Sequence, residues 1–144
     1  MVSQLTSSPQ NPSIANETSD LTLTWKYSIS SSIILARVGT ITGGGFERIV
    51  RRVGGGDIMV EAKYQDRFRA NITNSQAWLK ILQVQRSDKG MYVFQLEPVA
   101  GNSISSQLEL IVHCKYLPWL IQSSYIVDWF IHCTYIKAGY RAQK

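Results

Sequence analysis

A chain of 144 residues with 44% apolar content can bury one core of ordinary size and has little left for a second domain. The net charge of +5 is modest, and the basic residues are scattered except in the stretch ERIVRR, which contains Arg48, Arg51 and Arg52. Such a cluster is typical of a solvated strand face, so we expect no nucleic-acid partner. The two cysteines, Cys114 and Cys133, indicate no disulfide framework.

The first twenty residues are polar and rich in Ser, Thr and Asn, and no apolar run among them could form the core of a secretory signal. Taken literally, this start keeps the chain in the cytosol. A signal encoded upstream of the sequence would instead direct the chain to the secretory pathway. We expect residues 1–15 to be disordered and the folded domain to begin at residue 16.

The middle of the chain reads as strands. The stretch LTLTWKYSI, residues 21–29, alternates between apolar and polar side chains, as a half-buried strand does, and SIILARVGT, residues 32–40, is more continuously apolar. Gly clusters at 43–45 and 54–56 allow tight reversals around two further strand-like runs. A phosphate-binding loop is disfavoured there, because no Lys-Ser/Thr ending or helix-forming segment follows either cluster. Four more runs follow, at residues 66–73, 77–84, 90–98 and 105–113.

Seven to nine short strands in about a hundred residues, with no helical periodicity before residue 114, predict an all-β, antiparallel Greek-key β-sandwich. One segment of it has a specific spacing. The residues that carry this spacing are Leu79, Ile81, Val84, Asp88, Gly90, Tyr92 and Phe94.

This spacing resembles the L-x-I-x-x-V-x-x-x-D-x-G-x-Y-x-C signature of immunoglobulin domains, with Phe94 in place of the cysteine. The resemblance implies an immunoglobulin-like domain over residues 16–113, with Leu79 and Ile81 facing inward on strand E. It also implies that Tyr92 bonds back to the upstream backbone and that Asp88 pairs with Arg67. The long segment between residues 38 and 66 resembles the variable-type subset, which has additional C′ and C″ strands.

The partner cysteine of the family lies on strand B, where this chain has Trp25. The crosslink would close a loop of roughly seventy residues, worth about 4 kcal/mol, and two buried aromatic rings supply a comparable stabilisation. The tryptophan usual on strand C is also missing, with Leu35 or Ala36 in its neighbourhood. We therefore expect Trp25 and Phe94 to pack together across the sandwich, with no disulfide in the domain, and Trp78 to face outward.

Residues 114–144 do not continue the strand pattern, and we expect an irregular or helical tail. The stretch 117–136 has about the length of a membrane span. A central Asp128 opposes insertion by roughly 2.5–3.5 kcal/mol, so membrane contact is less favoured than an amphipathic appendage or a segment from a mis-spliced gene. His132 and Cys133 are too sparse a set for zinc. We expect no metal, no cofactor and no catalytic residues, and hence no enzyme, because neither His113 nor His132 lies in a recognisable catalytic pattern.

Two binding roles remain. The first is a cell-surface or secreted recognition or adhesion module of an invertebrate immunoglobulin-like protein, with N-glycosylation acceptors at Asn16 and Asn71. Its partner would be a protein, typically another immunoglobulin-like domain, of its own kind or a different one. The alternative is a cysteine-free structural domain inside the cell, of the kind found in muscle and cytoskeletal proteins.

The candidate binding surface is the face formed by strands C, C′, F and G, together with the loop EPVAGNSISS between the last two strands. Its polar residues would surround an apolar patch. They are Arg37, Arg48, Arg51, Gln95, Glu97, Gly101 and Asn102.

Overall fold

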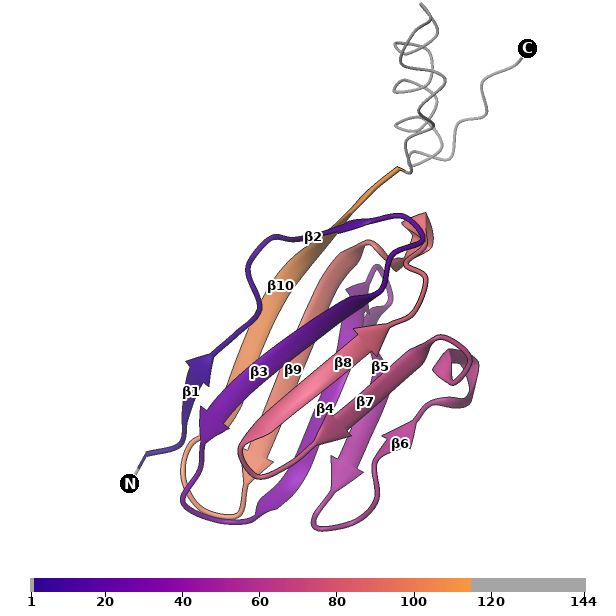
Figure 1. Cartoon of the computed structure of the whole chain (residues 1–144). Coiled ribbons are helices and arrows are strands. Elements are labelled where there is room, and N and C mark those ends of the chain that lie inside the picture. The colour runs from indigo at the N-terminus through magenta and orange to yellow at the C-terminus, as the bar shows by residue number, and fades with distance from the viewer. Residues whose placement is uncertain (1, 115–144) are drawn as a thin grey trace, which may run out of the picture.

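The computed structural model describes residues 2–114 as two β-sheets packed face to face (Figure 1). The first sheet has the strand order β1-β3-β8-β7, formed by β1 (Gln4–Ser7), β3 (Leu21–Ser28), β8 (Gln76–Ile81) and β7 (Phe68–Ile72). The second sheet has the order β2-β10-β9-β4-β5-β6, formed by β2 (Ser13–Asn16), β10 (Ile104–His113), β9 (Gly90–Pro98), β4 (Ile33–Thr42), β5 (Gly45–Val53) and β6 (Met59–Val60).

The pairings are antiparallel except between β2 and β10, which run parallel. Two short 3₁₀ turns connect strands, η1 (Ala62–Tyr64) before β7 and η2 (Arg86–Asp88) before β9. The chain crosses between the sheets at the β1–β2, β2–β3, β3–β4, β6–β7 and β8–β9 connections. The predicted antiparallel sandwich is therefore confirmed, and strands β5 and β6 extend the second sheet beyond β4.

Residues 1–15 were predicted to be disordered, and this prediction is wrong for most of the segment. β1 pairs with β3 at the edge of the first sheet, whereas β2 pairs with β10 at the edge of the second. The segment between these strands contains Pro9 and Pro12, with a cis peptide bond before Pro12. Four-residue strands at sheet edges have little periodicity of their own, so their pairing depends on the rest of the fold.

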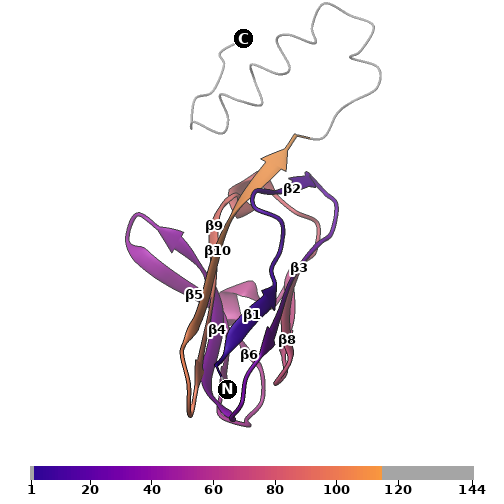
Figure 2. The same ribbon diagram turned by 90° about the vertical axis from the view of Figure 1, so that its left-hand side faces the viewer.

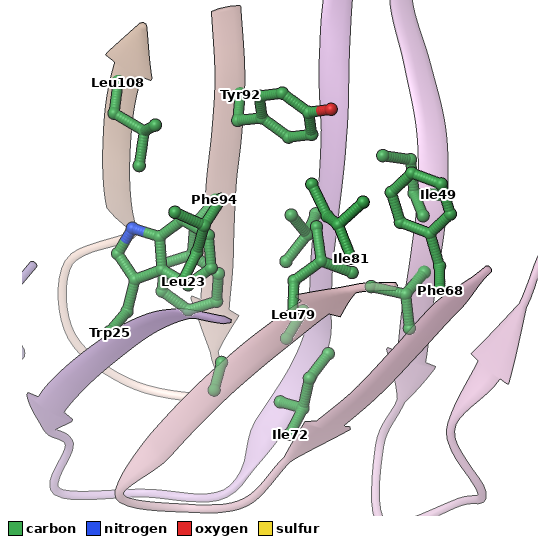
Figure 3. Close-up of a cluster of buried hydrophobic side chains, with 14 of the residues drawn as sticks. Leu23, Trp25, Ile49, Phe68, Ile72, Leu79, Ile81, Tyr92, Phe94 and Leu108 are labelled. Carbon is green, nitrogen blue, oxygen red and sulfur yellow. The ribbon is translucent and has the colours of Figure 1, made fainter. Parts of the chain in front are cut away.

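The interior contains the aromatic contact that the sequence predicted. Trp25 on β3 and Phe94 on β9 are both fully buried, and their rings stack with centroids 5.3 Å apart and an interplanar angle of 24°. Tyr27, also on β3, stacks on the same Phe94 ring, with ring centroids 5.5 Å apart. The indole Nε1 of Trp25 donates a hydrogen bond to Oγ of Ser106 on β10, at 3.2 Å. One aromatic group therefore joins β3 of the first sheet to β9 and β10 of the second (Figure 3).

The rest of the interior follows the strand alternation. Leu79 and Ile81 on β8 face inward and are fully buried, whereas Trp78, just before Leu79, is only half-buried. Ala36 on β4 is fully buried as well, and its small side chain leaves interior volume for the aromatic rings of β3 and β9. Figure 3 shows Phe68 of the first sheet beside Ile49 of the second, with Leu79, Ile81 and Ile72 in the same buried cluster.

Truncation of Trp25 or Phe94 to Ala should each lower the free energy of unfolding by about 3–5 kcal/mol, because each removes a large fully buried ring. The double variant should lose less than the sum, because either single change already removes the shared stack. Trp78→Ala is the matched control and should cost about 1 kcal/mol or less. Urea unfolding of the four variants measures these values.

Strict additivity of the two truncations would contradict a shared Trp25–Phe94 contact. A larger loss for Trp78→Ala than for Trp25→Ala would contradict the assigned register of β3 and β8.

A polar corner closes the end of the sandwich between β8 and β9. The guanidinium of Arg67 donates two hydrogen bonds to the carboxylate of Asp88, at 2.8 and 2.9 Å, and Asp88 is 7% exposed. The backbone N–H of Gln85 donates to the same carboxylate at 2.8 Å, and the hydroxyl of Tyr92 donates to the carbonyl oxygen of Asp88 at 2.7 Å. Val84 is fully buried in the turn. Both the ion pair and the tyrosine bond that the resemblance implied are therefore present.

These contacts change the ionisation of the corner. Burial raises the pKa of Tyr92, and the nearby Asp88 charge raises it further. Outside this corner, burial also raises the pKa of Tyr27 on β3, whose hydroxyl donates to the carbonyl oxygen of Thr73 at 2.5 Å. The hydrogen bonds to Asp88 raise the pKa of Arg67, so this guanidinium stays charged. Both buried phenols therefore stay neutral at a pH where an unfolded tyrosine ionises.

The free energy of unfolding should fall as the pH rises above about 10. In that range the unfolded chain has lost the Tyr92 proton while the folded chain still binds it, so the folded state binds more protons and loses stability by about 1.4 kcal/mol per pH unit for each such tyrosine. Tyr92→Phe should be less stable at neutral pH but should show a shallower alkaline slope. Urea unfolding from pH 8 to 11.5 tests this; equal slopes for the two proteins would contradict it.

Candidate interaction surface

The second sheet has one face packed on the first sheet and one face turned away from it, as the edge-on view in Figure 2 shows. Alternation along β4 decides which residues lie on the outward face. Ala36 and Val38 are fully buried in the interior, so Arg37, Gly39 and Ile41 point outward. The same alternation along β9 places Gln95 and Glu97 outward, between inward-facing Phe94 and Leu96.

An irregularity in the β4–β5 pairing shapes this face. Val38 pairs with Val50 but Gly39 pairs with Arg48, which leaves Ile49 as an extra residue in β5. Ile49 and Val50 are both fully buried, so two successive side chains enter the interior. A β-bulge bends its strand, and Figure 2 shows the end of the β4–β5 hairpin turned away from the sandwich.

Phe46 lies in the corner that this bend creates. A Cβ on Gly39 would come within 2.6 Å of the Phe46 ring and 2.2 Å of the Glu47 carbonyl oxygen, so only glycine fits under the ring. Val93, opposite Gly39 on β9, is 2% exposed although it does not belong to the interior cluster. The outward face therefore has a small packed centre of its own.

Exposed apolar side chains surround this centre on β4, β5 and β6. Val53 faces outward opposite Leu35, and Met59 faces outward opposite Arg51. Large apolar residues that remain exposed in a contiguous group are characteristic of interaction sites. On this face they are Ile41, Phe46, Val53 and Met59, with 43, 37, 57 and 52% of their surface exposed.

Two arginines lie side by side in the middle of the face. Arg37 on β4 is paired directly opposite Arg51 on β5. Nε of Arg37 donates to Oε1 of Gln95 at 2.7 Å, and its guanidinium carbon lies 4.7 Å from the centre of the Phe46 ring. Nε of Arg51 is buried without a hydrogen-bond partner among residues 2–114.

Four of the seven predicted surface residues, Arg37, Arg51, Gln95 and Glu97, lie together on the outward face. Arg48 is paired opposite Gly39 on the same two strands, whereas Gly101 and Asn102 lie in the β9–β10 connection. Arg48 is engaged near the β6 edge, where its Nε donates to Glu61 at 2.7 Å. The sequence did not indicate Phe46 or Gly39, because their contact depends on the bulge. Strand alternation from Arg37 could have indicated that Gly39, two residues later on β4, also faces outward.

Arg52, the third arginine of the ERIVRR stretch, does not belong to the outward face. Its side chain donates to the carbonyl oxygen of Ile72 on the opposite sheet at 2.7 Å and to that of Gly56 at 3.2 Å. The stretch was interpreted as a solvated strand face. The structure instead uses Arg52 to connect the two sheets, and it pairs Arg48 with a carboxylate.

Gly101 and Asn102 lie in the β9–β10 connection, residues 99–103, which is shorter than the predicted loop. The backbone of Ala100 exchanges hydrogen bonds with Oγ of Ser31, at 2.9 Å each. Gly101 has φ +101°, and a Cβ there would meet Oγ of Ser3 at 2.9 Å. The loop is therefore held by the β3–β4 connection and by the N-terminal segment.

A hollow of about 240 Å³ joins this end of the sheet to Arg37. Arg37, Gln95 and Glu97 line one side of it, and Ser103 and Ser105 line the other. Leu35 contributes an apolar wall. The hollow therefore continues the outward face from β4 and β9 to the start of β10.

Both predicted glycosylation acceptors are exposed. Asn16 lies at the end of β2, and Asn71 lies on β7 with its side-chain oxygen accepting a hydrogen bond from the N–H of Ile72. Asn71 is paired directly opposite the half-buried Trp78. Asn71 belongs to the first sheet, and Asn16 lies on β2 at the opposite end of the second sheet from β5 and β6.

Within residues 2–114, no three His, Cys, Asp or Glu side chains gather in a way that could hold a metal ion. The same part of the chain has no helix that is long and apolar enough to cross a membrane. Cys114 is disulfide-bonded. The expectations for Asp128, His132 and Cys133 lie outside the described residues.

Comparison of the structure with solved proteins shows an immunoglobulin-like fold. Murine CRIg superimposes with a TM-score of 0.61 at 16% identity, covering 81% of this chain and 100% of that one. A chain from the complex of titin M10 with the obscurin-like 1 Ig domain superimposes with a TM-score of 0.56 at 12% identity, covering 81% and 98%. Titin M4 gives a TM-score of 0.54 at 12% identity, covering 77% and 95%. No protein-family model and no curated sequence matches this chain.

Domains of this fold are typically non-enzymatic binding modules, and neighbours of this chain are found in complexes with other proteins. At these levels of identity the likeness concerns the fold alone. The function of this chain must therefore be argued from its own surface.

Proposed function

We propose that this chain is a non-enzymatic recognition module that binds another immunoglobulin-like domain through the outward face of its second sheet. The observation that carries the proposal is the group formed by Ile41, Phe46, Val53 and Met59, which are exposed together beside the arginine pair. An apolar centre with a polar border is the usual composition of a protein interface.

The architecture of the second sheet supports a variable-type domain. β5 and β6 are the additional strands next to β4, and they contribute three of the four exposed apolar residues. A seven-stranded domain would lack this part of the face. We therefore assign the interface to β4, β5 and β6, with β9 contributing polar contacts at its border.

We place this module outside the cell, either secreted or at the cell surface of an invertebrate, in adhesion or recognition. The exposed acceptors Asn16 and Asn71 support this placement, since both lie away from the proposed interface and sugars there would leave it open. The alternative is a structural domain inside the cell. It is supported by the aromatic contact that replaces the inter-sheet disulfide, because such a core needs no oxidising compartment.

Phe46→Asp should abolish partner binding, because it places a charge at the apolar centre of the face. The probe is a panel of purified immunoglobulin-like domains, measured by biolayer interferometry against the full chain. We expect at least one binder, with a loss of at least tenfold for Phe46→Asp. The control is Ile14→Asp. Ile14 is 55% exposed on β2, and three strands separate β2 from β5 in the sheet. The control variant should bind as tightly as the unchanged chain.

Thermal unfolding shows first that both variants are folded. A binder that is lost with Ile14→Asp but retained with Phe46→Asp would contradict the assignment of the face, and a complete absence of binders in the panel would contradict the proposed class of partner.

N-linked sugar should be found on the chain isolated from its own cells. Asn71, like Asn16, is exposed on an edge strand, and it is the acceptor to be measured first. Peptide mass spectrometry before and after enzymatic removal of N-glycans measures the occupancy, with conversion of Asn71 to Asp as the signature. An unmodified Asn71 together with an unmodified Asn16 would favour the intracellular alternative.

A further inference from the structure

We infer that the outward face selects a partner that presents a carboxylate to Arg37 and Arg51, and that it disfavours a second copy of this chain. The inference rests on the proposed function, because it specifies the chemistry of the partner bound at the same face.

The first step is the uncompensated charge. Arg37 and Arg51 are directly opposite each other on adjacent antiparallel strands, which brings their Cβ atoms to about 5 Å. Like charges at this position destabilise a sheet. The ion pairs among residues 2–114 involve Arg48, Lys63, Arg67 and Arg86, and neither Arg37 nor Arg51 takes part in one.

The second step is the arrangement of the two side chains. Arg37 is held by its bond to Gln95 and by its position over the Phe46 ring, so its guanidinium is oriented before any partner binds. Arg51 has a buried Nε with no hydrogen-bond partner. A planar guanidinium binds a carboxylate through two parallel hydrogen bonds, and an oriented one loses less conformational entropy when it does so.

The third step is what a partner would have to cover. The arginine pair is surrounded by Phe46, Val53 and Met59, so a protein that covers these apolar residues also removes water from Arg37 and Arg51. Burial of a charge is costly unless the charge is paired. A partner that presents a carboxylate here, surrounded by apolar residues of its own, covers the apolar side chains and also pairs the arginine charges.

The fourth step excludes a second copy in a symmetric pair. In a two-fold contact the same patch is present on both sides. β4 and β5 lie between β9 and β6 in the strand order, so this contact would bring four arginines together at its centre. Two acidic residues of the outward face, Glu97 on β9 and Glu109 on β10, lie toward the opposite side of β4 from Arg51. A third, Glu61, follows outward-facing Met59 by two residues and is already paired with Arg48. Repulsion between like charges therefore opposes self-association.

The test replaces the unknown partner by a charge-reversed copy of the chain. The probe is the double variant Arg37→Glu/Arg51→Glu, studied as the full chain by sedimentation equilibrium alone and in an equimolar mixture with the unchanged chain. The matched control is Arg69→Glu/Lys80→Glu, which reverses a pair of basic residues directly opposite each other on the other sheet. Near-ultraviolet circular dichroism shows that each variant is folded.

We expect the unchanged chain and the charge-reversed variant each to be monomeric, and their mixture to associate at least tenfold more tightly than either alone. The association should weaken as salt is raised from about 0.05 to 0.5 M, because salt screens the new charge pairs. The mixture with the control variant should stay monomeric. Arg37→Ala/Arg51→Ala should self-associate more than the unchanged chain, since it removes the repulsion and keeps the apolar group.

Self-association of the unchanged chain as tight as that of the mixture would overturn the inference, and so would a mixture that stays monomeric. A binder from the immunoglobulin-like panel separates this inference from the proposed function. If that binder is lost with Phe46→Asp but unaffected by Arg37→Glu/Arg51→Glu, the proposed function stands and the carboxylate requirement fails.

Discussion

The stack of Trp25 on Phe94 is the contact on which the rest of the sandwich depends. It joins β3 near the middle of one sheet to β9 near the middle of the other. Tyr27 extends the contact along β3, and Ser106 links it to β10. Two sheets that each bury one face can slide or separate unless something fixes their relative position. In this chain the stacked rings and the hydrogen bond from Trp25 to Ser106 fix that position, and no cysteine lies between the sheets.

The interior contact also determines the outward face. Because Phe94 and Leu96 face inward on β9, Gln95 must face outward, where it holds Arg37. The bulge at Ile49 also affects both the interior and the outward face. It buries an extra side chain beside Phe68, and it turns the hairpin so that Phe46 covers Gly39. The geometry of the proposed interface is therefore a consequence of how the core is filled.

The sequence predicted those parts of the fold whose signal is local. Alternation along the chain predicted the sandwich, and the immunoglobulin resemblance carried by the spacing from Leu79 to Phe94 implied the aromatic contact and the Arg67–Asp88 pair. It did not predict β1 and β2, because four-residue strands on either side of a proline-containing segment are stabilised by their neighbours rather than by their own pattern.

The candidate surface could be predicted only in outline. Arg37, Arg51, Gln95 and Glu97 follow from strand alternation and share a face. The pairing of Arg48 with Glu61, and the contact of Phe46 with Gly39, depend on a one-residue shift between β4 and β5 that no local pattern reveals. Such a shift is set by which side chains fill the interior, so it is a property of the tertiary structure.

The aromatic contact has a consequence for the unfolded chain. Trp25 and Phe94 are roughly seventy residues apart in the sequence, and nothing covalent keeps β3 near β9 once the sheets separate. A crosslink at these positions would act mainly by restricting the unfolded ensemble, whereas ring packing acts only when the native structure has formed. The entropy of closing this long loop must therefore be overcome each time the domain folds, and a topology that depends on such distant contacts belongs to the class of slowly folding domains.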